Sequence, residues 1–255
     1  MLNRRQQRRE CLKMLNKMPF FDIICLYVRA KIATMFREGG ILKVAWSSSH
    51  AEFLISDSYY FSTLERESRK KGIEIVEVAD FDELFCYPVI VFNYSEKPFD
   101  ESEIKAIERA VKNGKRIIFT AHFNNKDNVA EICNAVTERF GMRLKMDEVV
   151  EKEHFDEGDC RMVITSRVES YAEGVNQVVF PYSAPIEALH PDVRVIVRGQ
   201  ESAFTGSGER APVMAAERRM PSGGSLVVCG SCLFWDNYSI LRKDNLAFSI
   251  NLLSM

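Results

Sequence analysis

Short apolar runs alternate with amphipathic stretches along the chain after residue 40. Continuous or alternating apolar runs of this length are typical of buried strands, and they predict strands at 42–46, 73–78, 89–92 and 116–120. The stretches between them have helical periodicity and end at glycine, which predicts helices at 59–71, 100–111 and 128–140. Strand and helix therefore alternate, and this order favours an α/β fold with a doubly wound, mostly parallel sheet.

The second half of the chain is richer in strands. Apolar runs predict strands at 162–165, 178–180, 193–197, 213–219 and 225–229. The turn residues Pro221-Ser222-Gly223-Gly224 join the last two runs into a hairpin. A final helix is expected from Asp244 or Asn245, with its apolar stripe at 246, 250 and 253, whereas 199–210 is expected to be a loop.

The first 38 residues differ from the rest and predict a separate helical extension, which leaves 39–255 as the α/β domain. Residues 1–20 carry six basic side chains against one acid, and 20–37 form an amphipathic pattern with a wide apolar face. An apolar face of this size is expected to pack on its own domain or on a second copy, and a homodimer through residues 20–37 is favoured. The alternative is a basic arm that touches nucleic acid or a membrane surface.

Composition narrows the class without naming a function. The 255 residues are 46% hydrophobic and 27% charged with a net charge of −2, values typical of a globular chain with no overall attraction to nucleic acid. Seven scattered cysteines, of which only Cys229 and Cys232 form a C-x-x-C, favour reduced thiols and a cytoplasmic location. The sequence shows no second metal-ligand pair, no glycine-rich phosphate loop and no apolar stretch long enough to span a bilayer, so we expect no metal, cofactor or transmembrane segment.

Several short words occur in an order that resembles a known family. They are Phe99-x-x-x-Glu103-x-x-x-Ile107 before Asn113-Gly114; Phe140-Gly141-Met142 before Asp147-Glu148; Val179-Phe180-Pro181-Tyr182; and Gly223-Gly224 before Gly230-Ser231-Cys232-x-Phe234-x-Asp236-x-Tyr238 and Asn245. Residues 41–255 thereby resemble the GIFT domain, an amidotransferase-like domain of a core intraflagellar transport B subunit and of gliding-motility and ABC-transport-associated proteins. The resemblance implies a three-layer, flavodoxin-like fold of the class I glutamine amidotransferase type.

That resemblance also bears on catalysis. Class I amidotransferases carry a cysteine nucleophile on a glycine-rich turn after a central strand, and a later histidine, oriented by a glutamate, activates it. The corresponding turn here is 119–125, which contains neither Cys nor Gly, and no His-x-Glu follows the late strands. The resemblance therefore implies a domain without glutaminase machinery, and we assign no catalytic residue.

Polar side chains follow several predicted parallel strands, at the edge where α/β proteins bind ligands. The candidate ligand-binding residues are Ser48, Ser49, His50, Asn93, Ser95, His122, Asn124, Ser231, Trp235 and Asp236. These residue types suit a neutral polar ligand such as a carbohydrate, or a peptide. The simpler interpretation is that they cap helices and hold loops together.

Three function classes remain open from the sequence. A non-catalytic binding or scaffold domain is favoured, with protein partners and a carbohydrate or peptide as its candidate ligands. The alternative is a small-molecule hydrolase or transferase that uses the same edge, with His122, His50 and Cys232 as its catalysts. A nucleic-acid-associated factor acting through the basic first helix is the third.

Overall fold

A seven-stranded mixed sheet forms the centre of the molecule, in the order β10-β12-β13-β4-β3-β1-β2. The computed structural model describes residues 40–255. The strands are β1 (Leu42–Ser47), β2 (Ile73–Val78), β3 (Val89–Asn93), β4 (Arg116–Thr120), β10 (Val193–Arg198), β12 (Val213–Arg219) and β13 (Ser225–Cys229). Strands β2, β1, β3, β4 and β13 run parallel, whereas β12 runs antiparallel to both of its neighbours. The parallel part has the 2-1-3-4-5 order of flavodoxin-like folds.

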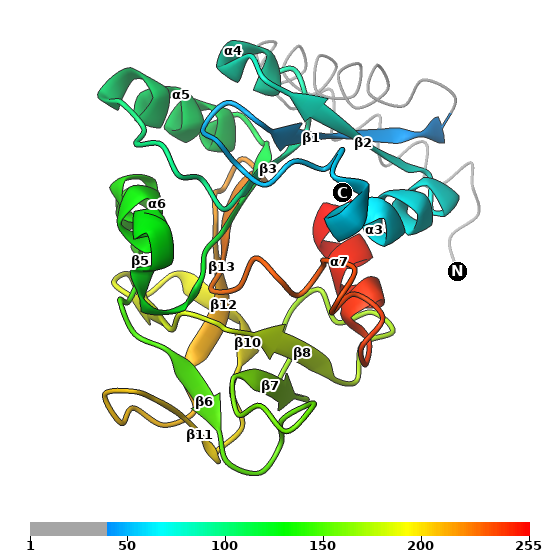
Figure 1. The fold of residues 1–255 in the computed structure, drawn as a ribbon. Coiled ribbons are helices and arrows are strands. Elements are labelled where there is room, and N and C mark those ends of the chain that lie inside the picture. The colour runs from blue at the N-terminus through cyan, green and yellow to red at the C-terminus, as the bar shows by residue number, and fades with distance from the viewer. Residues whose placement is uncertain (1–39) are drawn as a thin grey trace, which may run out of the picture. The chain divides into compact units, whose positions relative to one another are not determined.

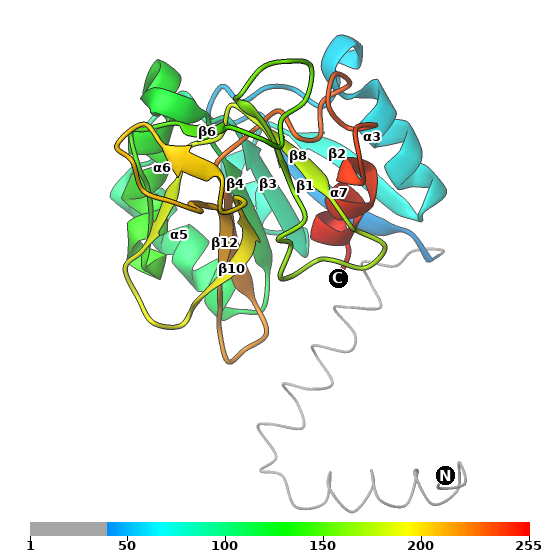
Figure 2. The same cartoon turned by 90° about the horizontal axis from the view of Figure 1, so that it is seen from below.

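Helices cover both faces of this sheet and complete three layers (Figures 1 and 2). One face is covered by α3 (Ser58–Lys70) and α7 (Asn245–Leu253), and the other by α4 (Phe81–Leu84), α5 (Glu101–Lys112) and α6 (Val129–Thr137). Aspartates 57, 80 and 100 cap α3, α4 and α5 by accepting backbone N–H bonds, which fixes where each helix begins. The predicted α/β architecture and the predicted hairpin of β12 and β13 are confirmed.

Three two-stranded ribbons lie outside the main sheet. They pair β5 (Met142–Leu144) with β9 (Ile186–Ala188), β6 (Val149–Glu151) with β11 (Ala203–Thr205), and β7 (Met162–Thr165) with β8 (Val178–Pro181). Two 3-10 helices, Phe123–Asn128 and Glu138–Phe140, flank α6. The expectation of a loop throughout 199–210 is wrong, because β11 lies within it and pairs with β6.

The sheet separates two apolar cores. Alternate residues of one strand enter different cores: Val44 and Trp46 pack on the α3 and α7 side, and Ala45 packs on the α4, α5 and α6 side. In α7 the predicted apolar stripe is partly wrong, since Phe248 and Leu252 are fully buried while Leu246 and Ile250 are only partly covered. The helix therefore presents a different line of residues to the core than the sequence indicates.

Glycine is required where β13 ends. A Cβ on Gly230 would overlap the carbonyl oxygen of Ala184, because the two backbones pass each other there. The Ala184 N–H donates to the Gly230 oxygen over 2.8 Å, and the Gly230 N–H donates to the Met214 oxygen over 2.7 Å. This close approach explains why the chain carries Gly-Ser at the carboxyl end of the strand.

The predicted helical extension over residues 1–38 lies outside the described residues. From Leu42 to Met255 the chain forms one compact unit. None of the helices within residues 40–255 is both long and apolar enough to cross a membrane.

Candidate functional site

Four parallel strands end along one edge of the sheet, and the candidate residues follow them. His50 comes after β1, Asn93 ends β3, His122 comes after β4, and Ser231 comes after β13. Because these strands are mutually parallel in the order β1-β3-β4-β13, the prediction that these four residues share one edge is confirmed. Strand order reverses between β1 and β3, since β2 lies on one side of β1 and β3 on the other, and such switch points are where open α/β sheets bind ligands.

Most candidate side chains at this edge are buried rather than open to a crevice. Exposed fractions are 0% for Asn93, Ser95, Ser231 and Trp235, and 4–8% for His50, Asp236 and His122. Ser48 and Ser49 are half-buried, and Asn124 is exposed. The structure therefore places these residues at one edge but divides them into separate hydrogen-bonded groups.

The first group, which we call the elbow cluster, consists of Asn93, Tyr94, Thr120, His122 and Trp235. The Asn93 Oδ1 accepts from the Thr120 hydroxyl over 2.7 Å and from the Trp235 indole N–H over 3.1 Å. The Tyr94 and His122 rings meet edge to face, with their centroids 6.1 Å apart. These bonds tie the ends of β3 and β4 to the loop after β13.

His122 of the elbow cluster is held neutral and has few polar contacts. Burial, reinforced by the nearby charge of Lys126, lowers the pKa of its imidazole to about 4. Its Nδ1, like the Asn93 Nδ2, has no hydrogen-bond partner among the described residues. Its ring instead stacks with Tyr182 at a centroid distance of 5.8 Å. The Nδ1 of this imidazole therefore accepts no hydroxyl or thiol proton from a described residue.

The cysteines near the elbow are also buried. Burial raises the pKa of both the Cys229 and Cys232 thiols, which disfavours the reactive thiolate. All five cysteines within residues 40–255 are free, so the C-x-x-C forms no disulfide. Of the three catalysts considered from sequence, the geometry thus leaves neither Cys232 nor His122 in an activated state.

The remaining candidates beyond β4 and β13 hold loops together. The Ser231 hydroxyl donates to the Pro181 oxygen over 2.5 Å, and the Asp236 carboxylate accepts from the Ser239 N–H over 2.9 Å. Burial raises the pKa of the Asp236 carboxyl to about 6. The Asn124 N–H donates to the Asp147 oxygen over 3.0 Å. These contacts match the simpler interpretation offered for such residue types.

The second group lies at the β1/β3 switch point. This switch-point cluster consists of residues from the end of β1, from the β1–α3 connection, from the loop after β3 and from α5, namely Ser47, Ser49, His50, Glu52, Ser95 and Glu103. The His50 Nδ1 lies 2.8 Å from the Ser49 hydroxyl, and its Nε2 lies 3.2 Å from the Glu103 Oε2. The Glu52 carboxylate accepts from the His50 N–H over 2.7 Å. Here both ring nitrogens of a histidine have polar partners.

The ring of His50 is also fixed by packing. It stacks on Phe99 with a centroid distance of 4.0 Å and meets Phe81 and Phe92 edge-on at 5.5 and 6.3 Å. The Glu103 carboxylate is fixed as well, because its Oε2 accepts the Asp100 N–H over 2.8 Å as part of a capping box on α5. The two partners therefore face each other without free rotation.

Sequence reasoning missed Glu52 and Glu103 as members of this edge. Glu103 belongs to the motif Phe99-x-x-x-Glu103-x-x-x-Ile107 that carries the family resemblance, and its position three residues after Asp100 is typical of a helix cap. Its partner His50 is 53 residues away in the chain. Only the parallel pairing of β1 and β3 brings the two together.

An exposed apolar surface lies outside the switch-point cluster. It consists of Phe53 and Leu54 from the β1–α3 connection and Tyr59 and Tyr60 from the first turn of α3, and we call it the aromatic surface. The four side chains are 38–78% exposed. Phe53 stacks on both Tyr94 and Tyr60, with centroids 4.6 and 6.3 Å apart, so the aromatic rings form a continuous array.

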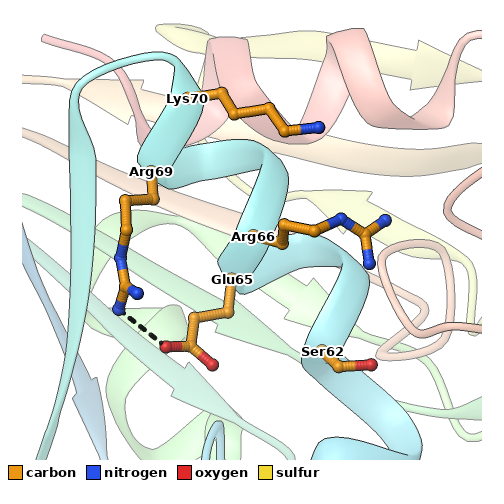
Figure 3. A pocket seen from close by; sticks show the side chains of 5 residues that line it. All are labelled: Ser62, Glu65, Arg66, Arg69 and Lys70. Carbon is orange, nitrogen blue, oxygen red and sulfur yellow. Dashed lines mark hydrogen bonds and ion pairs between the residues drawn. The ribbon is translucent and has the colours of Figure 1, made fainter.

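A hollow elsewhere on the surface is lined by α3 alone among the described residues, and Figure 3 shows it. The Arg69 guanidinium pairs with Glu65 over 2.9 Å, and the Lys70 ammonium pairs with Glu67 over 2.8 Å. Its charges are thus satisfied within one helix. Within residues 40–255 no three His, Cys, Asp or Glu side chains are grouped so that they could hold a metal ion.

A family and a relative each match most of this chain. The family described as Domain of unknown function (DUF4350) matches residues 61–253. A relative from Aquifex aeolicus (strain VF5), described as an uncharacterized protein, is 43% identical over 219 residues, covering 83% of this chain and 93% of the relative.

One solved structure shows the same fold. The mmIFT52 N-terminal domain matches with a TM-score of 0.69 at 14% identity, over 83% of this chain and 98% of that domain. A cytoplasmic protein from Salmonella typhimurium matches with a TM-score of 0.44 at 15% identity, over 83% of this chain and 98% of the other. The resemblance inferred from sequence is confirmed by the first match. The chain therefore belongs to the DUF4350 family and has the class I amidotransferase-like fold.

Proposed function

We propose that this domain is a binding module that engages a protein partner through the aromatic surface, and that it does not hydrolyse glutamine. The observation that carries the proposal is the exposure of Phe53, Leu54, Tyr59 and Tyr60 side by side at the ligand-binding edge of the fold. Contiguous exposed apolar side chains of this kind mark interaction sites. Aromatic residues are also the residues that dominate binding energy in protein interfaces.

The backbone beneath the aromatic surface is rigid. The Trp46 indole N–H donates to the Phe53 oxygen over 2.7 Å, and the Phe53 N–H donates to the Asn93 oxygen over 3.1 Å. On α3, the Asn237 side-chain amide donates to the Tyr59 oxygen over 2.7 Å. A surface already held in place loses little conformational entropy on binding, which favours recognition.

The chemistry of this surface indicates the partner. Phenyl and phenol faces provide apolar area with hydroxyl groups at the rim, which suits an apolar segment of a protein. Asn93 and Ser95 are buried, so a carbohydrate would contact the tyrosine faces and the few polar candidates that are partly exposed, Ser48, Ser49 and Asn124. The elbow supplies no activated nucleophile, and this supports binding over glutamine hydrolysis.

The test is photo-crosslinking followed by affinity measurement. A photoreactive phenylalanine analogue in place of Tyr59, which is 78% exposed, should crosslink to one partner in the native cell extract. Binding of that purified partner is then measured for the full chain, for Tyr59→Ala and for Leu241→Ala, an exposed apolar residue outside the aromatic surface. Loss of a central aromatic residue is expected to weaken binding by about 30-fold, on the order of 2 kcal/mol, and Leu241→Ala should bind as the unchanged protein does.

Equal affinity of the Tyr59→Ala variant and the unchanged protein would contradict the proposed surface. Selective binding of a glycan in place of a protein would transfer the proposal to the carbohydrate.

A homodimer through residues 20–37 and a nucleic-acid role of the basic first helix stay predictions, as does a cytoplasmic location.

A further inference from the structure

The switch-point cluster contains a hydrogen-bond relay that partner binding does not need. The Ser47 and Ser49 hydroxyls lie 2.9 Å apart, the Ser49 hydroxyl lies 2.8 Å from the His50 Nδ1, and the His50 Nε2 lies 3.2 Å from the Glu103 carboxylate. Hydroxyl, imidazole and carboxylate in this order are the groups of a serine-dependent acyl-transfer site.

The direction of the relay follows from what each group can donate. A carboxylate has no proton to donate, so a bond in which Glu103 accepts from His50 places the proton on Nε2. The unprotonated Nδ1 is then an acceptor and takes the bond from the Ser49 hydroxyl. The Ser47 hydroxyl donates to the Ser49 oxygen in turn. The histidine is thereby in the tautomer that can receive the proton of Ser49.

The position of each group fits its role. Ser49 is half-buried, whereas the neighbouring His50 is only 4% exposed. Three phenylalanine rings hold the imidazole, and the α5 capping box holds the carboxylate. The relay also crosses the β1/β3 switch point, the place in this fold class where ligands bind.

We infer that Ser49 is an acyl-accepting nucleophile for a neutral carboxylic ester, with His50 as its general base and Glu103 as a positioning residue. This activity goes beyond the proposed partner binding and does not rest on it, because no residue of the relay belongs to the aromatic surface. It also differs from glutaminase chemistry, which would require a cysteine on the turn after β4, at residues 119–125.

The reaction balances with water as the second substrate. The Ser49 oxygen bonds to the ester carbonyl carbon while its proton passes to the His50 Nδ1. The tetrahedral adduct collapses, the ester C–O bond breaks, and the leaving alkoxide takes the proton from Nδ1 and departs as the alcohol. A water molecule then gives its proton to Nδ1 and attacks the acyl carbon, and the return of that proton to the Ser49 oxygen releases the carboxylic acid.

Carboxyl groups around the relay set the substrate charge. Besides Glu103, the side chain of Glu52 is 4% exposed and accepts from the His50 N–H over 2.7 Å and from the Ser95 hydroxyl over 3.1 Å. Two carboxyl groups in contact with His50, one at its backbone N–H and one at its Nε2, disfavour an anionic substrate such as a phosphate ester. An uncharged ester is therefore the class that fits.

The test uses the full chain with a fluorophosphonate reagent and with p-nitrophenyl acetate. Peptide mass spectrometry should find the phosphonyl adduct on Ser49, and Ser49→Ala should lower ester turnover by about 100-fold or more. Ser58→Ala is the matched control, since Ser58 lies in the first turn of α3, is exposed, and has no side-chain partner among the described residues. Its turnover should equal that of the unchanged protein.

Glu103→Gln separates positioning from folding. Glutamine preserves the capping box of α5, so the variant should keep its melting temperature. Loss of the carboxylate charge should lower kcat by roughly tenfold or more with little change in KM, because the charge stabilises the imidazolium that forms in the transition state more than it stabilises the neutral imidazole. Failure of the reagent to modify Ser49, or equal turnover of Ser49→Ala and the unchanged protein, would overturn the inference.

Discussion

His50 follows β1 and His122 follows β4 at the same edge of one sheet, and the two histidines differ in the described partners of their Nδ1 atoms. His50 lies between a serine hydroxyl and a carboxylate. His122 has an unpartnered Nδ1 and stacks among aromatic rings. Burial is similar for both, at 4% and 8% exposed, so burial alone does not distinguish them.

The difference extends to the clusters around them. In the elbow cluster, polar atoms serve the fold: Asn93 joins two strands to the loop after β13. In the switch-point cluster, polar atoms form a series of short contacts from the Ser47 hydroxyl through Ser49 and His50 to the Glu103 carboxylate. Under the inference drawn for Ser49, the reactive hydroxyl lies at the β1/β3 switch point and not on the turn after β4, where class I amidotransferases carry their nucleophile.

The largest expected effect separates the clusters by stability. Asn93→Ala removes the shared acceptor of Thr120 and Trp235 and leaves two buried donors unpartnered, which should cost about 3 kcal/mol of unfolding free energy. Ser95→Ala, which removes one bond to Glu52 in the other cluster, should cost only about 1 kcal/mol. Urea unfolding followed by circular dichroism measures both, and equal losses would erase the distinction between a structural cluster and a chemical one.

A smaller effect follows from the lowered pKa of His122. Its folded-state pKa of about 4 lies below the ordinary 6.5, so the unfolded chain binds more protons between these values and stability falls as pH decreases through this window. At pH 5 the penalty from this one residue is about 2 kcal/mol relative to pH 8. His122→Gln should remove it, and the difference in unfolding free energy between variant and unchanged protein should therefore change with pH in favour of the variant on acidification.

In the same titration, Asp236 changes the folding stability with pH in the opposite direction. Its carboxyl pKa is raised to about 6, so the folded state binds more protons between about 4 and 6 and gains stability as pH decreases through that range. The two effects offset each other in the unchanged protein. A difference between His122→Gln and unchanged protein that does not vary with pH would show that His122 is not held neutral by burial.

Much of the fold was predictable because its strands are long apolar runs. Strands such as β1, β3 and β4 carry their own signal, whereas three-residue strands such as β6 and β11 exist only because distant segments pair. The line of α7 residues facing the core was misjudged at Leu246 for a similar reason: a short, largely apolar helix has no single face that sequence can identify.

The sequence identified some residues of the candidate site and missed others. Strand ends identified His50, Asn93 and His122, because parallel strands bring their carboxyl ends to one edge. Glu103 was hidden by its capping role, which already explains its presence in the sequence. Side-chain partners across the switch point depend on tertiary packing, and no pattern along the chain encodes them.

The measurement that tests the account most directly is the tautomer of His50. Long-range proton–nitrogen NMR of the histidine-labelled full chain at neutral pH distinguishes a proton on Nε2 from one on Nδ1. The account predicts that His50 carries its proton on Nε2, bonded to Glu103, with Nδ1 free to accept from Ser49. A proton on Nδ1 would contradict the account, because the imidazole could then not take the proton of Ser49. The switch-point cluster would in that case be structural, like the elbow cluster.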